Sequence, residues 1–225
     1  MKVTRLGQAG LLFVSGGTAV LVDPYFTDSA FAVSGVHRRS EAPAWVWDIK
    51  PDAVLITHDH IDHYDPETFS HFVNEKTAVT VLSPRSVWEK ARLQGGGNNF
   101  VLVSPGVQWT CGGVAVKTVK AFHSDPYAVG FVLEAEGKTV YITGDTLYNP
   151  EAFKGAPAPF AADYVFLPIN GRGNNMNAGD AALLAAACRA KHAVPVHYGM
   201  LDDISPQSFV SPAKKVMNDY TEYEI

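Results

Sequence analysis

The sequence has little cysteine, little charge and no long apolar run, and each shortage excludes a class of protein. Cys111 and Cys188 are its only cysteines, which is too few for a disulfide framework. No apolar stretch approaches the length of a helix that crosses a bilayer, so no membrane partner is expected. Glycine and proline are scattered rather than gathered in a linker. At 225 residues, the chain is therefore expected to form one domain over residues 1–225 and to be cytoplasmic.

Positive charge is also scarce. The chain has 18 lysines and arginines against 23 aspartates and glutamates, a formal net charge of −5. Nucleic-acid backbones are held mainly by lysine and arginine, so this balance disfavours a general nucleic-acid partner. A small anionic substrate in a locally cationic pocket fits an acidic protein better, and a homo-oligomer is left open.

What the sequence does have is a dense group of metal-ligand side chains. Residues 57–65 contain three histidines and three aspartates, directly after the apolar run 53–56. Imidazole and carboxylate groups are the ligands that borderline divalent cations accept at neutral pH. A solvated loop rich in histidine is the alternative, but four ligand-type residues in the order His-x-His-x-Asp-His favour a metal site. These residues are His58, His60, Asp62 and His63.

Three isolated residues downstream are candidates for further ligands, because one short loop rarely encloses two cations. Each follows a run typical of a β-strand: 114–119, 139–143 or 193–196. Strand ends would therefore deliver all seven candidates to one place. The three additional residues are His123, Asp145 and His197.

The complete ordered pattern resembles the metallo-β-lactamase superfamily: the His-x-His-x-Asp-His loop, a histidine, an aspartate in a Gly-Asp-Thr turn, and a last histidine. Residues 22–29, 55–68, 168–172 and 195–200 narrow the likeness to the branch that contains L-ascorbate-6-phosphate lactonase. The resemblance implies an α/β protein with a four-layer αβ/βα sandwich and a metal site at one edge of the sheets. Composition alone predicts only a mixture of helices and strands.

The resemblance also implies two divalent metal ions, with zinc as the first choice and manganese as the second. A hydroxide between two such ions is available near neutral pH, so the implied activity is hydrolysis of a small ester such as a lactone or sugar-phosphate lactone. Asp62 and Asp145 would be catalytic, and Asp62 could return a proton to the leaving group. By family correspondence His58, His60 and His123 hold one ion, Asp62, His63 and His197 hold the other, and Asp145 bridges them.

Other residues are candidates for supporting roles. Asp23 matches an aspartate near the metals of the family, where it would orient a ligating imidazole. An Asx turn before Pro24 is the alternative role, and the two roles are compatible. Asn170 and Arg172 lie in a polar loop, and Arg172 is the candidate for binding an anion, against a solvated loop arginine. Tyr198 is a candidate for substrate contact, and Tyr127 and Tyr198 are both candidates for proton donation, with packing as the alternative for each.

Two other activities stay open at this point. The same hydroxide could attack phosphorus in a phosphodiesterase or nuclease, although the acidic balance disfavours it. A diiron redox protein of the same fold is less favoured, because His60 stands where those proteins usually have a carboxylate.

Local patterns predict several elements as well. Residues 11–22 read as a hairpin, and Ser83 is a candidate N-cap of a helix. Asn177 or Asp180 begins a second helix, and residues 205–217 are expected to contain a third.

Overall fold

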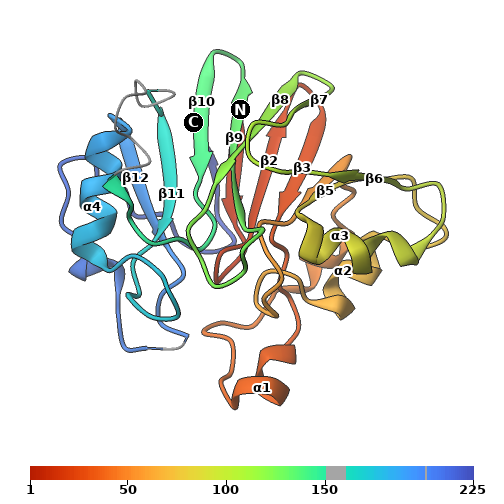
Figure 1. Cartoon of the computed structure of the whole chain (residues 1–225), viewed down its shortest axis with the longest axis horizontal. Helices are drawn as coiled ribbons and strands as arrows, with labels where there is room; N and C mark the ends of the chain where they lie inside the picture. The colour runs from red at the N-terminus through yellow and green to blue at the C-terminus, as the bar shows by residue number, and fades with distance from the viewer. Residues whose placement is uncertain (151–160, 201) are drawn as a thin grey trace.

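The computed structural model describes residues 1–150, 161–200 and 202–225, and within this part of the chain the strands form two facing β-sheets (Figure 1). The seven-stranded sheet runs, in spatial order, β13 (Glu222–Glu224), β1 (Lys2–Arg5), β2 (Leu11–Ser15), β3 (Thr18–Val22), β4 (Ala53–Leu55), β5 (Thr80–Ser83) and β6 (Asn99–Leu102). The six-stranded sheet runs β12 (His192–Val196), β11 (Tyr164–Pro168), β10 (Lys138–Ile142), β9 (Val129–Ala135), β8 (Val114–Lys120) and β7 (Gln108–Cys111).

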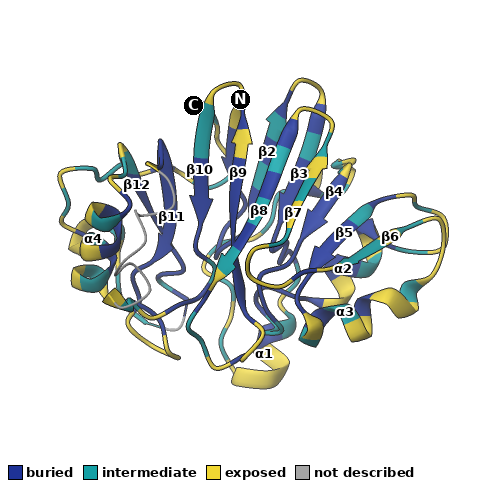
Figure 2. Ribbon diagram, turned by 45° about the horizontal axis from the view of Figure 1, so that its top comes forward, coloured by how far each residue is buried: buried dark blue, intermediate teal, exposed yellow. Residues whose placement is uncertain are grey.

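Helices cover the outer faces of both sheets. The helices α2 (Pro66–Phe72) and α3 (Arg85–Ala91) pack on the seven-stranded sheet, and α4 (Ala178–Ala187) packs on the other. Figure 2 shows that the strands are largely buried while these helices present an exposed side. This arrangement confirms the four-layer αβ/βα sandwich. No helix among the described residues is long and apolar enough to span a membrane.

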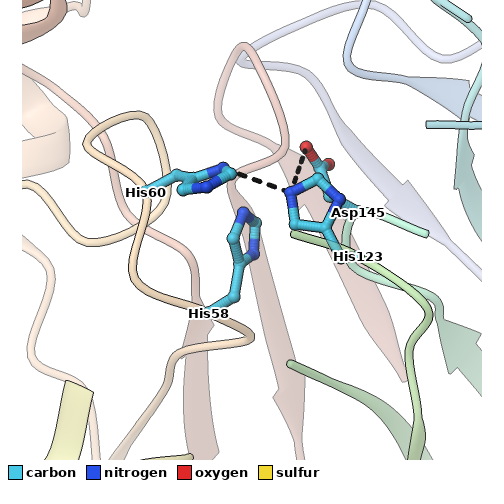
Figure 3. Close-up of side chains that lie close together, drawn as sticks. All are labelled: His58, His60, His123 and Asp145. Carbon is cyan, nitrogen blue, oxygen red and sulfur yellow. Dashed lines mark hydrogen bonds and ion pairs between the residues drawn. The ribbon is translucent and has the colours of Figure 1, made fainter. Parts of the chain in front are cut away.

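The candidate ligands leave the strands at one edge of the sandwich. Residues 56–65 join β4 to α2, while His123, Asp145 and His197 follow β8, β10 and β12. These last three strands run in the same direction, so their carboxyl ends meet at the same edge. In the close-up of Figure 3, His123 and Asp145 from one sheet face His58 and His60 from the other.

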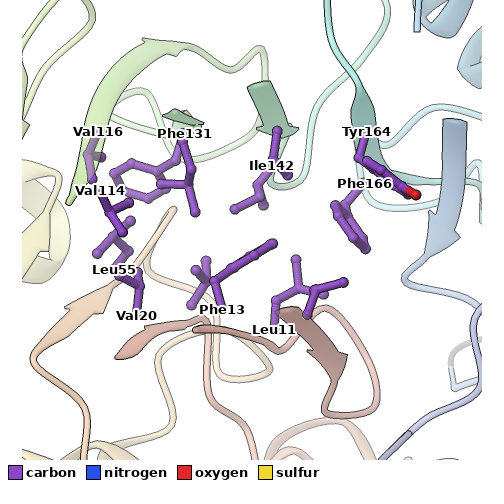
Figure 4. Packing of buried hydrophobic residues seen from close by; sticks show 14 of the residues in the cluster. Leu11, Phe13, Val20, Leu55, Val114, Val116, Phe131, Ile142, Tyr164 and Phe166 are labelled. Carbon is purple, nitrogen blue, oxygen red and sulfur yellow. The ribbon is translucent and has the colours of Figure 1, made fainter. Parts of the chain in front are cut away.

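The core between the sheets sets the relative position of these two groups of loops. Phe13 of β2 meets Phe166 of β11 edge to face, with ring centroids 5.9 Å apart. Leu55 of β4 belongs to the same buried cluster as Phe131 and Ile142 of the opposite sheet (Figure 4). Because protein interiors are close-packed, this core leaves little freedom for one sheet to slide on the other.

Most of the locally predicted elements are confirmed. Residues 11–22 form the hairpin β2–β3, and Asn177 caps α4 by accepting hydrogen bonds from the backbone N–H groups of Gly179 and Asp180. Ser83, however, ends β5, and the N-cap of α3 is Pro84.

The helix expected within residues 205–217 is wrong. The segment has only a short 3-10 turn, η4 (Pro206–Ser208), and Lys214 forms a parallel β-bridge with Ala193 of β12. Prolines at 206 and 212 cannot donate backbone hydrogen bonds, which favours this extended course beside the sheet.

Candidate metal centre

The seven candidate ligands form two adjacent clusters. In each, the ligand atoms lie within 4.8 Å of one another. We call them the four-residue cluster, which comprises His58, His60, His123 and Asp145 (Figure 3), and the three-residue cluster, which comprises Asp62, His63 and His197. This division agrees with the one implied by the family correspondence.

The chemistry of the clustered atoms fits metal ions. Nε2 of His58 is buried and has no hydrogen-bond partner among the described residues, whereas the buried Nε2 of His63 faces another candidate ligand, Oδ1 of Asp145, at 3.3 Å. A buried polar atom without a partner costs free energy, and a cation would supply the missing interaction for an imidazole nitrogen. The other ring nitrogen of each histidine is held by the protein, which aims Nε2 into its cluster.

Asp145 lies between the two clusters. Its Oδ1 is 3.3 Å from Nε2 of His63, and its Oδ2 is 3.1 Å from Nε2 of His197. Its Oδ2 is also 3.9 Å from Nε2 of His123, which belongs to the four-residue cluster. This carboxylate therefore has the position that a bridging ligand would need. Gly144, at φ 61°, permits the turn, because a Cβ there would lie 2.9 Å from Cβ of Thr57.

The buried carboxylates and imidazoles shift one another's pKa values. Burial favours a neutral carboxyl at Asp145, but His197 and His63 outweigh it and hold the pKa well below its usual range. Burial likewise opposes protonation of His63, yet Asp145, Asp62 and Asp23 raise its pKa well above the ordinary value. Burial lowers the pKa of His58, which keeps that imidazole neutral and able to bind a cation.

Asp23 is placed to orient one histidine of each cluster. Its Oδ2 accepts hydrogen bonds from Nδ1 of His63 at 2.8 Å and from Oγ1 of Thr57 at 2.6 Å. Oγ1 of Thr57 in turn lies 3.0 Å from Nδ1 of His58. The carboxylate thus acts on His63 directly and on His58 through a hydroxyl, as a buried partner of ligating imidazoles does.

Two residues at the clusters were missed by sequence reasoning. Gln8 donates from Nε2 to Oδ2 of Asp62 at 2.9 Å, and Asn175 donates from Nδ2 to Oδ2 of Asp145 at 2.7 Å. Asn175 lies in the same polar loop as Arg172, and the polar character of this loop is the sequence signal that points to it. Gln8 lies in the turn between β1 and β2, far from every motif, so no sequence signal pointed to it.

The candidate substrate residues are dispersed. Arg172 is exposed, in the loop whose Asn175 reaches Asp145. Asn170 is buried, and its Oδ1 has no hydrogen-bond partner in residues 1–150, 161–200 and 202–225. The hydroxyl of Tyr198 accepts a hydrogen bond from Nη1 of Arg5 at 2.8 Å, which gives this tyrosine a packing role.

Tyr127 instead lines a hollow beside the four-residue cluster. The hollow has a volume of about 320 Å³ and is open to solvent. Tyr127 is half-exposed there, with the guanidinium of Arg85 over its ring. The residues around the hollow are His60, Asp59, Ser86, Ser124, Asp125, Pro126 and Tyr127.

The aspartates outside the motif have structural partners. Asp59 pairs with Lys90 at 2.5 Å, and Asp65 caps the N-terminus of α2. The remaining histidines also contact residues away from the clusters: His37 stacks on Phe31, His71 contacts Trp47, and His192 contacts Tyr164.

Comparison with known proteins places the chain in a family. Residues 18–198 match the model of the β-lactamase superfamily domain. A UPF0173 metal-dependent hydrolase of Geobacillus sp. (strain WCH70) is 30% identical over 228 residues, which cover 94% of this chain and 92% of that protein.

Solved structures share the fold. The metallo hydrolase Igni18 of Ignicoccus hospitalis matches with a TM-score of 0.78 at 21% identity, covering 100% of this chain and 98% of that one. CmlA, a diiron β-hydroxylase of Streptomyces venezuelae, matches with a TM-score of 0.70 at 19% identity, covering 88% and 45% respectively. At these identities the likeness shows the fold alone.

Proposed function

The chain belongs to the UPF0173 metal-dependent hydrolase family of the metallo-β-lactamase superfamily, and from this premise we propose that it hydrolyses a small anionic ester at a two-metal centre. A lactone or sugar-phosphate lactone is the proposed substrate class, with zinc as the first candidate metal and manganese as the second. The observation that carries the proposal is the pair of ligand clusters on either side of Asp145.

The bound ions would supply a hydroxide nucleophile at neutral pH and stabilise negative charge that develops on the substrate. Asp145 and Asp62 are the carboxylates assigned to catalysis. His63 and His197 hold Asp62 ionised against the effect of burial, because they lower its pKa, so Asp62 stays a carboxylate that can bind a cation. Its Oδ2 is held by Nε2 of Gln8 and Nε2 of His197, which orients the carboxylate.

The hollow beside His60 supports a small substrate. Its volume of about 320 Å³ lies at the lower end of the range typical of small-molecule sites. The ring of Tyr127 offers an apolar face, and the hydroxyl of Ser124 lies 3.3 Å from Nε2 of His60. We assign to this hollow the part of the substrate that flanks the scissile bond, and to Arg172 an accessory contact with an anionic group.

The test is metal analysis of the purified protein followed by a panel of lactones, thioesters and phosphodiesters. We expect two metal ions per chain and turnover of a lactone, and we expect Asp145→Asn to lower kcat at least 100-fold, in keeping with the loss of a positioned catalytic group. Asp163→Asn is the matched control, because Asp163 is also buried but bonds Thr139 and Lys191.

Three outcomes would count against the proposal. A protein that carries two metals but cleaves no member of the panel would refute the small-ester assignment. Turnover of an aryl phosphodiester without lactone turnover would favour a phosphodiesterase. Iron with a visible absorption band in anaerobically purified protein would favour a redox function.

A further inference from the structure

Gln8 contacts two members of the three-residue cluster from a part of the chain that carries no ligand. We propose that Gln8 is a positioning residue that selectively stabilises the cation held by Asp62, His63 and His197. The inference rests on the proposed two-metal centre and adds to it a residue that determines the occupancy of one of the two sites.

The side chain and the backbone of Gln8 make separate contacts. Nε2 donates to Oδ2 of Asp62 at 2.9 Å, and the backbone carbonyl accepts from the backbone N–H of His197 at 3.0 Å. His197 has a positive φ of 53°, a conformation that costs free energy for a residue other than glycine. A hydrogen bond to its backbone helps to hold that conformation. Gln8 therefore controls the carboxylate of one ligand and the backbone of another.

The orientation of the Gln8 amide follows from its neighbour. The residue is buried, and Oε1 has no hydrogen-bond partner within the described part of the chain. Exchanging the two amide atoms would place Oε1 against the carboxylate of Asp62, and two acceptors would then face each other. Oδ2 of Asp62 lies 2.9 Å from the amide nitrogen, so only the orientation that presents an N–H donor to this oxygen is favourable. In this orientation Oε1 is left without a hydrogen bond, and Nε2 donates to Asp62.

The turn that carries Gln8 is itself well ordered by hydrogen bonds. The backbone N–H of Leu6 donates to the carbonyl of Gly10 at 2.8 Å, and that of Gly10 donates to the carbonyl of Gly7 at 3.1 Å. A Cβ at Gly10 would lie 3.3 Å from the carbonyl oxygen of Asp23, so the turn packs directly against the residue that orients His63. These contacts fix the turn, and the turn fixes the position of Gln8 relative to Asp62 and His197.

The four-residue cluster has different supports. Nδ1 of His123 contacts the carbonyl of Asn174 at 3.2 Å, and Nε2 of His60 contacts Ser124. Asn175 holds Asp145. None of these hydrogen bonds involves Gln8. Loss of the Gln8 side chain should therefore lower the affinity for the ion of the three-residue cluster and leave the affinity for the other ion unchanged.

The experiment measures zinc binding to the full chain by chelator competition and elemental analysis, with zinc alone as the probe. Gln8→Met keeps the length of the side chain and removes the donor, whereas Gln8→Asn keeps an amide that is one methylene too short. We expect both variants to bind one of the two zinc ions about 10- to 100-fold more weakly and the other within about twofold. Gln108→Met is the control, because Gln108 lies exposed on β7.

A double-mutant cycle identifies which of the two sites has lost zinc affinity. Gln8→Met should add little to His197→Ala, which already damages the three-residue cluster, and should act independently of His60→Ala. Equal weakening of both ions, or unchanged binding of both, would overturn the proposal, as would a fall in the Tm of the metal-free protein with no change in zinc affinity. If the wild-type protein binds fewer than two zinc ions, the two-metal centre itself is refuted, which is a separate and recognisable failure.

Discussion

Replacing Asp23 by asparagine tests whether a single buried carboxylate organises both clusters. Asp23 has a positive φ of 42°, and asparagine tolerates this conformation, so the substitution changes the hydrogen bonding with little backbone strain. The carboxylate accepts from the backbone N–H of Thr57, from its hydroxyl, and from Nδ1 of His63. An asparagine amide has one acceptor oxygen, and its NH₂ group would face donors in either orientation.

The geometry sets the size of the expected effect. If the amide oxygen takes over the bond to the backbone N–H of Thr57, the NH₂ group faces the hydroxyl of Thr57 and Nδ1 of His63. A hydrogen bond to a charged group contributes about 1.5 to 3 kcal/mol, so the loss of these two bonds should lower the free energy of unfolding by roughly 3 to 6 kcal/mol. The loss of the single hydrogen bond to His63, about 1.5 to 3 kcal/mol, corresponds to metal binding that is about 10- to 100-fold weaker. The affinity for the ion of the three-residue cluster should fall most, because Asp23 bonds His63 directly. The affinity for the other ion should fall less, because Asp23 reaches His58 only through the hydroxyl of Thr57.

The assay combines zinc affinity with thermal unfolding of the metal-free protein. Asp163→Asn is again the control: it removes a buried carboxylate far from the clusters and should lower stability without changing zinc affinity. The reasoning would be refuted if Asp23→Asn bound both zinc ions like the wild type. It would equally be refuted if the ion of the four-residue cluster were lost while that of the three-residue cluster were retained.

The remaining predictions concern pH, one tyrosine and one cysteine. The neighbouring carboxylates raise the pKa values of His63 and His197 against the effect of burial, so protons compete with metal at these two imidazoles. Metal affinity should therefore rise as pH increases above the ordinary histidine pKa of about 6.5, with proton release detectable by calorimetry in buffers of different ionisation enthalpy. An affinity that fell over this range would contradict the assignment of these ligands. Tyr198→Phe should keep kcat within about twofold and lower the free energy of unfolding by about 1 to 3 kcal/mol, because the hydrogen bond from Arg5 is lost. A large fall in kcat at unchanged stability would instead make Tyr198 a proton donor. Burial raises the pKa of the Cys188 thiol to about 12, so mass spectrometry should find Cys188 unalkylated in native protein near pH 8 and alkylated in denaturant.

Local sequence was sufficient for much of the fold. The Ser-Gly-Gly-Thr turn between two short β-like runs in residues 11–22 and the side chain of Asn177 act over a few neighbouring residues, and both elements form as predicted. Residues 205–217 show the limit of such reasoning, because their course is decided by pairing with β12, which lies elsewhere in the chain. Tyr198 shows it as well, since its buried partner Arg5 lies on β1, almost the whole chain away.

The sequence by itself determined which ligand types are present and placed each at the end of a strand, because hydrophobic periodicity and neighbouring residues are local properties. The family resemblance already implied a bridging Asp145, but only the tertiary structure decided its distances to His63 and His197, that Asp23 serves a histidine in each cluster, and that Gln8 reaches Asp62. The contact of Asp145 with His63 joins loops from both sheets, so its distance depends on how the core between the sheets packs. The contacts of Asp23 and of the Gln8 side chain join loops of the seven-stranded sheet that are distant in sequence, so they depend on the order of its strands. No pattern within a short window of sequence carries that information.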